Sequence, residues 1–483
     1  MSSPDTDPPS LYAKREPIFP KAVNGWFRRL KWVILGITLA IYYITPWIRW
    51  DRGPGMPDQA VLVDLAHRRF FFFFIEIWPH EFYFVAGLLV MAGLGLFLFT
   101  SALGRVWCGY ACPQTVWTDL FLLVERKVEG DRNNQIRLLR QKWDAQKIRL
   151  RLTKWSLWLL IGLLTGGAWV FYFTDAPTLL RNLFTGEAHP VAYTTIAIMT
   201  ATTFFFGGFA REQICIYACP WPRIQAAMMD EDTLTVAYRE WRGEPRGKIG
   251  RGEATKSDGG VKGDCIDCMA CVNVCPMGID IRDGQQMECI TCALCIDACD
   301  EIMDRIGKPR GLIDYMALKD ETAERAGNAP VPVWRHILRP RTMLYFGLWS
   351  LIGVGLVVAL FMRSPFDLTI SPVRNPLFVT MSDGSIRNTY ELRLRNKQHE
   401  QRSFAISAQV DGTPLDPGML SIEGEAGAQT DVAADLTQLV RIYVTAPAGS
   451  PLATRSATGL RFYVEDLATG QIESVASLFN GPN

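Results

Sequence analysis

The chain has 483 residues, a formal net charge of +1 and 49% hydrophobic residues, with 15 Trp and 12 Cys. The near-neutral charge balance does not indicate a nucleic-acid-binding protein. The apolar residues are concentrated in a few long runs, which favours a multi-domain membrane protein.

Five apolar runs are long enough to cross a bilayer, since a spanning helix needs about 20 residues. Buried core helices are the alternative, but the length and the uncharged interiors of the runs disfavour it. The first run lacks a small-residue cleavage site, so it is interpreted as an anchor rather than a signal peptide. We therefore predict an α-helical transmembrane bundle of five helices, at residues 32–50, 82–103, 155–174, 191–209 and 344–362.

The distribution of basic residues predicts the orientation. Eleven Lys and Arg lie between the second and third runs, whereas only Arg181 lies between the third and fourth. Because basic loops stay inside, the N-terminus and all twelve Cys are predicted to be cytoplasmic. The predicted regions are a tail (1–31), four membrane helices (32–210), a cytoplasmic region (211–342), a fifth helix (343–363) and a periplasmic domain (364–483).

Two membrane hairpins end in the same motif, Cys-x3-Cys-Pro. The first pair is Cys108 and Cys112, and the second is Cys215 and Cys219. Cysteines four apart share one helix face, and a following Pro fits the first turn of a new helix. Buried cysteines or a structural metal are the alternatives, but two matched pairs favour a shared redox or metal site. Soft thiolates suit Cu(I), zinc or another iron–sulfur cluster.

Other cofactors are less well supported. No Cys-x-x-Cys-His occurs, and none of the five His lies inside a predicted span, which disfavours haem. No phosphate-binding Gly-rich loop is present, and residues 243–263 are interpreted as a flexible basic linker. The aromatic run at 70–74 is interpreted as lipid or core contacts in preference to a quinone site.

The remaining eight cysteines form two copies of Cys-x2-Cys-x2-Cys-x3-Cys. This spacing is typical of ferredoxins that hold two [4Fe–4S] clusters, in which the fourth Cys of each run ligates the other cluster. Zinc sites or disulfides fit the triple spacing poorly. The predicted ferredoxin-like module covers about residues 262–305. Its first cluster is assigned to Cys265, Cys268, Cys271 and Cys299, and its second to Cys289, Cys292, Cys295 and Cys275.

The last 120 residues show short alternating segments, for example at 390–395, 404–408, 440–444 and 460–464, separated by turn residues. About seven strands of this kind predict an all-β, immunoglobulin-like sandwich. The segment has neither Cys nor Trp, so the prediction depends on patterning alone. We expect it to serve in docking rather than catalysis.

Together these stretches resemble the cytochrome c oxidase accessory proteins called CcoG, FixG or RdxA over nearly the whole chain. The resemblance is carried by residues 107–119, 218–223 and 387–397 and by the double cysteine run, although Asp300 stands where a ferredoxin has Pro. It implies a bacterial inner-membrane iron–sulfur protein needed to assemble a cbb-type oxidase. It also implies a cupric reductase and an immunoglobulin-like tail.

From this resemblance we expect an enzyme that passes electrons through two [4Fe–4S] clusters to Cu(II), with the four Cys-x3-Cys-Pro thiols as candidate copper or redox ligands. The expected partners are membrane lipid, copper chaperones, oxidase assembly factors and an electron donor that the sequence does not identify. Two alternatives remain open. One is a quinol-linked electron-transfer subunit without copper chemistry, since related quinol dehydrogenases share the Cys-x3-Cys-Pro pairs. The other is a non-enzymatic assembly scaffold.

Overall fold

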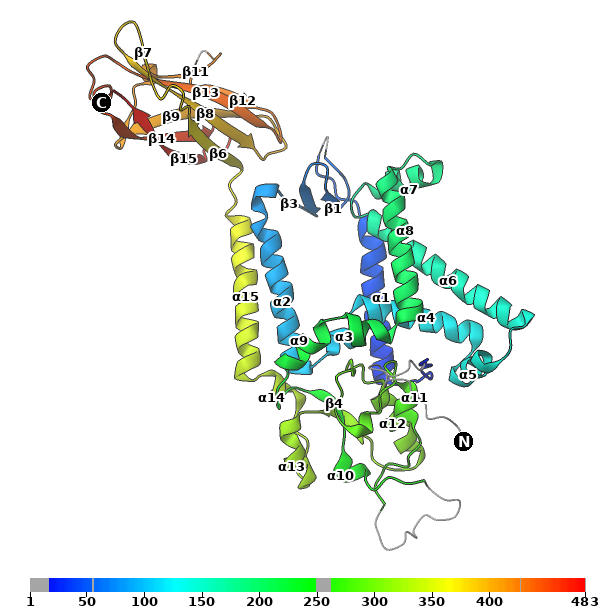
Figure 1. Ribbon diagram of the computed structural model, residues 1–483. Helices are drawn as coiled ribbons and strands as arrows, with labels where there is room; N and C mark the ends of the chain where they lie inside the picture. The colour runs from blue at the N-terminus through cyan, green and yellow to red at the C-terminus, as the bar shows by residue number, and fades with distance from the viewer. Residues whose placement is uncertain (1–16, 54–55, 249–261, 426, 483) are drawn as a thin grey trace, which may run out of the picture. The chain divides into compact units, whose positions relative to one another are not determined.

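The computed structural model describes residues 17–53, 56–248, 262–425 and 427–482 (Figure 1). The chain divides into two compact units, Met1–Leu356 and Val357–Asn483. Residues 1–16 of the predicted tail and 249–261 of the predicted linker lie outside the described residues.

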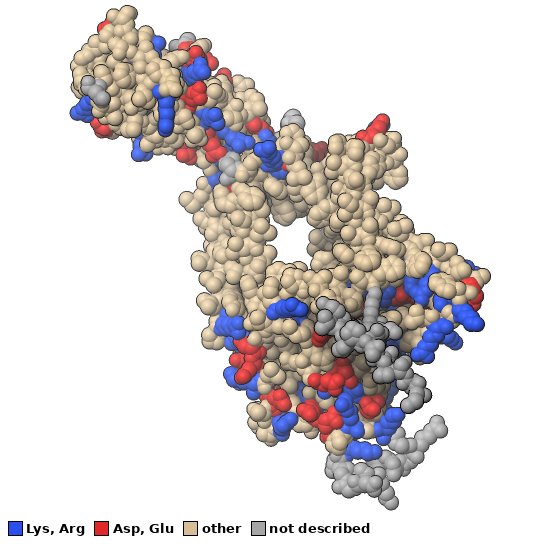
Figure 2. Space-filling model, in the orientation of Figure 1, with Lys and Arg blue, Asp and Glu red and all other residues tan. Residues whose placement is uncertain are grey.

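Four helices in the described parts of the chain are long and apolar enough to cross a membrane: Trp26–Trp47 (α1 and η1), Tyr83–Leu103 (α2), Pro190–Ala210 (α8 and η3) and Pro340–Phe361 (α15). They match four of the five predicted spans. Residues 155–170 of the predicted third span lie within α6 (Ala145–Val170), whose first ten residues carry four basic side chains, and the last four residues of the span follow the helix. The fifth span therefore stays a prediction. Figure 2 shows almost no charge along α2 and α15, whereas charged side chains gather on the part of the first unit below them.

The apolar helices and α6 pack in two groups, and small residues lie at the contacts of both groups. In one group, Gly87 of α2 lies against Leu356 of α15, and Trp349 Nε1 donates to the Met91 carbonyl oxygen at 3.1 Å. In the other, Gly162 and Gly166 bring α6 against the backbone of α8. Small residues let membrane helices approach closely, which increases their van der Waals contact.

Buried ion pairs hold the basic ends of the second group. Asp119 of α4 (Pro113–Glu129) pairs with Arg28 at 3.1 Å and with Lys31 at 3.0 Å. Glu125 pairs with Lys154 at 3.0 Å and with Arg211 at 2.9 Å. Part of the positive charge used to predict the orientation is therefore balanced by carboxylates.

The cysteine-rich region folds around a small antiparallel pair, β4 (Thr235–Tyr238) and β5 (Ile313–Met316). Its two cysteine runs lead into α11 (Ala270–Val274) and α12 (Leu294–Arg305). Asp297 of α12 accepts from the backbone amides of Phe27 at 3.2 Å and Arg28 at 2.7 Å. This carboxylate caps the first turn of α1 and so fixes the cysteine-rich region to a membrane helix.

The Phe run at 70–74 falls largely in a three-stranded sheet, where Phe71 is buried and Phe72 is exposed.

The remaining helices and short strands of the first unit complete the connections between these parts. The elements are α1 (Trp26–Ile44), η1 (Thr45–Trp47), β1 (Val61–Asp64), β2 (Arg69–Phe72), β3 (Ile75–Ile77), η2 (Pro79–Glu81), α2 (Tyr83–Leu103), α3 (Val106–Tyr110), α4 (Pro113–Glu129), α5 (Arg132–Arg140), α7 (Ala176–Thr185), α8 (Pro190–Phe205), η3 (Phe206–Ala210), η4 (Ile214–Ala218), α9 (Trp221–Met228), α10 (Glu240–Gly243), η5 (Ile281–Asp283), η6 (Leu318–Asp320), α13 (Glu321–Arg325), α14 (Val333–Ile337) and α15 (Pro340–Phe361).

The second unit is a sandwich of two antiparallel sheets. One has the order β10-β9-β14-β15 with β12 beside β9, and the other has the order β11-β13-β8-β6 with β7 beside β8. Alternate residues of the long strands point into a core that includes Tyr390, Phe404 and Phe462. The strands are β6 (Phe366–Pro372), β7 (Val379–Thr380), β8 (Ile386–Asn396), β9 (Arg402–Val410), β10 (Thr413–Pro414), β11 (Leu420–Ile422), β12 (Gln429–Val432), β13 (Thr437–Ala446), β14 (Ala457–Asp466) and β15 (Ile472–Asn480).

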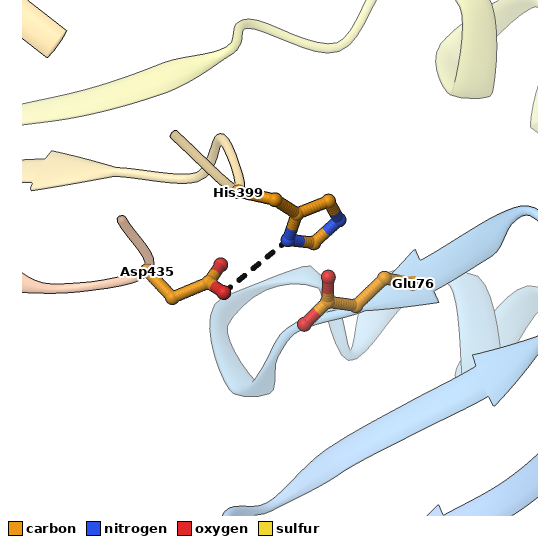
Figure 3. A group of neighbouring side chains, drawn as sticks. All are labelled: Glu76, His399 and Asp435. Carbon is orange, nitrogen blue, oxygen red and sulfur yellow. Dashed lines mark hydrogen bonds and ion pairs between the residues drawn. The ribbon is translucent and has the colours of Figure 1, made fainter. Parts of the chain in front are cut away.

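The four alternating segments singled out in the sequence lie in β8, β9, β13 and β14. The described residues hold more strands than the seven predicted, because β7, β10 and β11 are only two or three residues long and leave no alternating pattern. In this unit His399 forms an ion pair with Asp435 at 3.2 Å (Figure 3). Glu76, which Figure 3 also draws, belongs to β3 of the first unit and pairs there with Arg69 at 3.2 Å.

Candidate iron–sulfur and thiol sites

Two cavities in the cysteine-rich region are lined by the two predicted ligand sets. The first is lined by Cys265, Cys268, Cys271 and Cys299. The second is lined by Cys275, Cys289, Cys292 and Cys295, with Cys271 between the two. Cys275 and Cys299 are the fourth cysteines of the two runs. Each lies about one helical turn after the third cysteine of its run and lines the cavity of the other run. The cysteines that line each cavity are thus grouped as the spacing assigns them, and their role as cluster ligands stays a prediction.

The repeated loops owe their shape to residues in the left-handed region. Asp267 and Met269 have φ of 53° and 58°, and Thr291 and Ala293, 24 positions later, have φ of 54° and 59°. Such values curl the chain tightly around each middle cysteine, Cys268 in one loop and Cys292 in the other. The two loops thus have the same local geometry as well as the same spacing.

The surroundings of these thiols fit a metal cluster. Burial raises the pKa of Cys275 and Cys299 to about 12 and that of Cys271 and Cys289 to about 11. A buried thiol with a raised pKa stays neutral unless a cation stabilises its thiolate. Four sulfur donors in an apolar shell are the donor set of a [4Fe–4S] cluster.

Asp300, the departure from the ferredoxin pattern, has a structural use. Its Oδ1 accepts from the backbone amide of Gly311 at 3.0 Å, which links α12 to the segment before β5. Burial raises the pKa of this carboxyl. Asp300 does not line either cysteine-lined cavity.

The four Cys-x3-Cys-Pro thiols, here called the thiol quartet, come together from the ends of two hairpins. Cys108 lies in α3 and Cys112 directly precedes α4, whereas Cys215 lies in η4 and Cys219 directly follows it. Burial raises the pKa of Cys108 and Cys215 to about 12 and also raises that of Cys112. Cys219 adds to the rise in all three, so the four sulfurs are close enough to act on one another's charge.

The spacing of the sulfurs limits what the thiol quartet holds in this conformation. Four thiolates around one zinc ion, each about 2.3 Å from it, stand about 3.8 Å apart. Among the residues that the structure describes, no three cysteine sulfurs lie within 4.8 Å of one another. The quartet is therefore not a closed mononuclear cage. All twelve cysteines are free of disulfides.

The thiol quartet adjoins the second cysteine-lined cavity. Cys108 and Cys215 pack against the apolar cluster formed around Cys292, which Cys275 and Cys295 also contact. Gln225, fully buried, accepts from the Cys108 thiol at 3.2 Å. The two candidate sites are thus separated only by side chains of a single apolar cluster.

Three residues of the first hairpin fasten it to the second cysteine loop. A Cβ on Gly109 would lie 2.6 Å from the carbonyl oxygen of Ile290, so only glycine permits this approach. The Tyr110 hydroxyl donates to the Cys292 carbonyl oxygen at 3.1 Å. Arg105, almost fully buried, donates to the carbonyl oxygens of Met287 and Pro222. Sequence reasoning did not assign these residues a role, although Gly109 and Tyr110 stand inside the motif it quoted.

Comparisons with known proteins match models for three parts of the chain. A 4Fe-4S binding domain matches residues 84–129, a 4Fe-4S dicluster domain matches 210–318, and the IG-like fold at the C-terminal of FixG matches 356–482. The chain is thus similar to iron–sulfur proteins at both cysteine-containing parts, and its second unit has the immunoglobulin-like fold that its patterning predicted.

Three curated proteins are similar over almost the entire chain. Protein RdxB of Cereibacter sphaeroides is 70% identical over 100% of this chain and 99% of its own length. Protein RdxA of the same organism is 66% identical over 98% of both chains. Nitrogen fixation protein FixG of Rhizobium meliloti is 52% identical over 98% of this chain and 94% of its own.

Proposed function

The chain belongs to the family of FixG, RdxA and RdxB, and from that premise we propose that this iron–sulfur oxidoreductase reduces Cu(II) to Cu(I). The Cu(I) serves copper delivery and the assembly of a cbb-type cytochrome c oxidase. The protein works in a bacterial inner membrane with its N-terminus and cysteines in the cytoplasm and its C-terminal domain in the periplasm. Copper chaperones and oxidase assembly factors are its partners.

One observation carries the proposal. The thiol quartet, a group of soft ligands, lies against the apolar cluster around Cys292, so a copper ion there is next to the second cysteine-lined cavity. Electron transfer needs short distances through packed protein, and the contacts of Gly109 and Tyr110 keep this distance short.

The cysteines of the two cavities divide the cluster ligands between them. The first cluster would be held by Cys265, Cys268, Cys271 and Cys299, and the second by Cys275, Cys289, Cys292 and Cys295. When bound, such clusters supply one-electron carriers. The protein's own contribution is to bury them, to fix their loops and to exclude water from the space between them and the thiol quartet.

The thiol quartet suits copper as a substrate. Cu(II) prefers nitrogen and oxygen ligands, whereas thiolates stabilise Cu(I), so a sulfur site favours the gain of one electron: Cu(II) plus one electron gives Cu(I). The four sulfurs are spaced as an open site, which leaves a path for release of the ion. Closed four-ligand sites serve structure, while open sites serve exchange and catalysis.

Two double variants test this proposal and act as controls for each other. Changing Cys108→Ser and Cys112→Ser should abolish copper binding but leave the EPR signals of both clusters. Changing Cys268→Ser and Cys292→Ser should damage both clusters and stop Cu(II) reduction, while Cu(I) supplied directly should still bind.

Protease resistance and membrane insertion of both variants must match wild type, because cluster ligation also supports folding. Wild-type Cu(II) reduction by a well-folded, cluster-free variant would refute the electron relay and favour a scaffold. Normal cluster reduction without any copper binding by wild-type protein would favour the electron-transfer subunit without copper chemistry.

A further inference from the structure

A third cavity, of about 390 Å³, shares a wall with the predicted second cluster site. Cys289 lines both this cavity and the second cysteine-lined one. Cys289, an assigned ligand of the second cluster, therefore forms part of the wall between this cavity and the predicted cluster site. Neither the cluster ligands nor the thiol quartet explains its presence.

The cavity lies at the inner end of α2, one of the four apolar helices. Two residues of the segment that leads into β4 hydrogen-bond to the last turn of α2: Thr233 Oγ1 donates to the Ser101 carbonyl oxygen at 3.1 Å, and the Leu234 amide to that of Ala102 at 3.3 Å. Figure 1 shows α3, α9 and α14 gathered at the ends of α2 and α15. These short helices expose Trp107, Trp221 and Trp334, which are 47%, 45% and 57% exposed. Exposed Trp is typical of a membrane–water interface, so the cavity is at the depth that a lipid-soluble molecule reaches.

The lining combines an apolar surface with a few polar groups. Met229, Met287 and Leu318 supply the apolar surface, and Arg105 and Glu231 supply charge. In the parts of the chain that the structure describes, the buried Nε of Arg105 has no hydrogen-bond acceptor. A buried N–H without an acceptor is costly, and a ligand oxygen would provide one.

This lining selects among electron-carrying ligands. A nucleotide would bring phosphates next to the carboxylate of Glu231, which repels them, whereas Asp230 is already paired with Arg339 and Arg341. An uncharged aromatic ring with two oxygens fits better: it packs between thioether and alkyl groups, accepts from a guanidinium when oxidised, and donates to a carboxylate when reduced. Cavities of about 300–1,000 Å³ hold ligands of this size.

We propose that this cavity binds the head group of a lipid-soluble quinol, which is the electron donor. This inference rests on the proposed function, whose electron source it names. Oxidation of the quinol breaks two O–H bonds, releasing two protons to water at the open side and two electrons. The electrons leave one at a time by way of the Cys289 wall, one to each of two one-electron carriers, and suffice to reduce two Cu(II) to two Cu(I).

The test uses two neighbouring alanines of α9. Ala226 lines the cavity, whereas Ala227 is exposed and does not. Ala226→Phe fills the cavity, and Ala227→Phe adds the same side chain outside it. Leu318→Trp fills the cavity from η6 and serves as a second blocking variant in case Ala226→Phe disturbs α9.

Two measurements use the purified full-length protein. In the first, an azido-substituted decylbenzoquinone is photo-crosslinked and the labelled peptides are identified by mass spectrometry. In wild type and in Ala227→Phe the label should be found on peptides that contain Met229 or Met287. In both blocking variants the amount of label on these peptides should be at least tenfold lower. In the second, decylbenzoquinol should reduce the clusters of wild type but not of the blocking variants, while dithionite reduces all of them.

Equal labelling of all four proteins, or labelling elsewhere in the chain, would overturn the inference. So would cluster reduction by the quinol at the wild-type rate in both blocking variants. Cu(II) reduction by dithionite-treated protein is measured alongside. If it persists while quinol binding is absent, the donor site is refuted and the proposed function stands; if it is absent while labelling is as expected, the proposed function fails and the quinol site stands.

Discussion

Gly109→Ala should loosen the junction between the thiol quartet and the second cysteine loop. The new Cβ would stand 2.6 Å from the Ile290 carbonyl oxygen and 3.0 Å from the Cys292 Cα. Ordinary van der Waals contact begins near 3.4 Å, so α3 and the loop must separate by roughly 0.8 Å. Both neighbours are backbone atoms, so no side chain can move aside. Overpacking of this kind costs about 1–3 kcal/mol, which raises the population of opened loops about 5- to 150-fold.

The assay is the rate at which the anaerobic protein loses iron to a chelator, which reports opening of the cluster loops. Gly167→Ala is the matched control, because it makes the same change in a helix where no atom lies within 4 Å of the new Cβ. The Gly109 variant should lose iron about 5- to 150-fold faster than wild type, and the Gly167 variant should lose it at the wild-type rate. Iron loss at the wild-type rate in Gly109→Ala would refute the close-packed junction.

Three further predictions follow from other parts of the chain. The anaerobic protein should contain about eight iron and eight acid-labile sulfides, and a preparation that reproducibly holds zinc without sulfide would contradict the cluster assignment. A reporter fused after Asn483 should be active only if it is a reporter that works outside the cytoplasm, and cytoplasmic activity there would mean that the span count is wrong. Asp119→Asn should destabilise the fold by about 3–5 kcal/mol, because it leaves Arg28 and Lys31 buried without a counter-charge, whereas Asp304→Asn at an exposed pair should change nothing. Burial alone would raise the pKa of Asp119, but Lys31 and Arg28 hold it below its usual value. The stabilisation is therefore fully present above the ordinary pKa of the carboxyl and is lost as the pH falls through its lowered value, and the difference in thermal unfolding between wild type and Asp119→Asn at pH 7 measures it.

The cysteine pattern predicts an interleaved grouping of the eight thiols, and the two cavities are lined by cysteines in that grouping. Each run is local, and thiolate spacing of this kind admits few alternatives, so Cys275 and Cys299 were assigned across the two loops before any fold was known. The alternation in the last 120 residues likewise predicted the sandwich, because a strand that buries one face has a period of two. Sequence also located the four helices of the described residues that are long and apolar enough to cross a membrane.

The arrangement around these features needed the tertiary structure. Nothing in the sequence says that Gly109 meets Ile290, 181 positions away, that Gln225 accepts from Cys108, or that the sulfurs of the quartet are spaced too widely for one tetrahedral metal. The third cavity joins Arg105, which follows α2, the end of α9 and the loop of Cys289, three segments that are far apart in the chain. Local patterns record which face of an element is buried and which residues bind soft metals. Which buried faces meet depends on the packing of the whole chain, and that packing alone placed the thiols beside the second cluster loop.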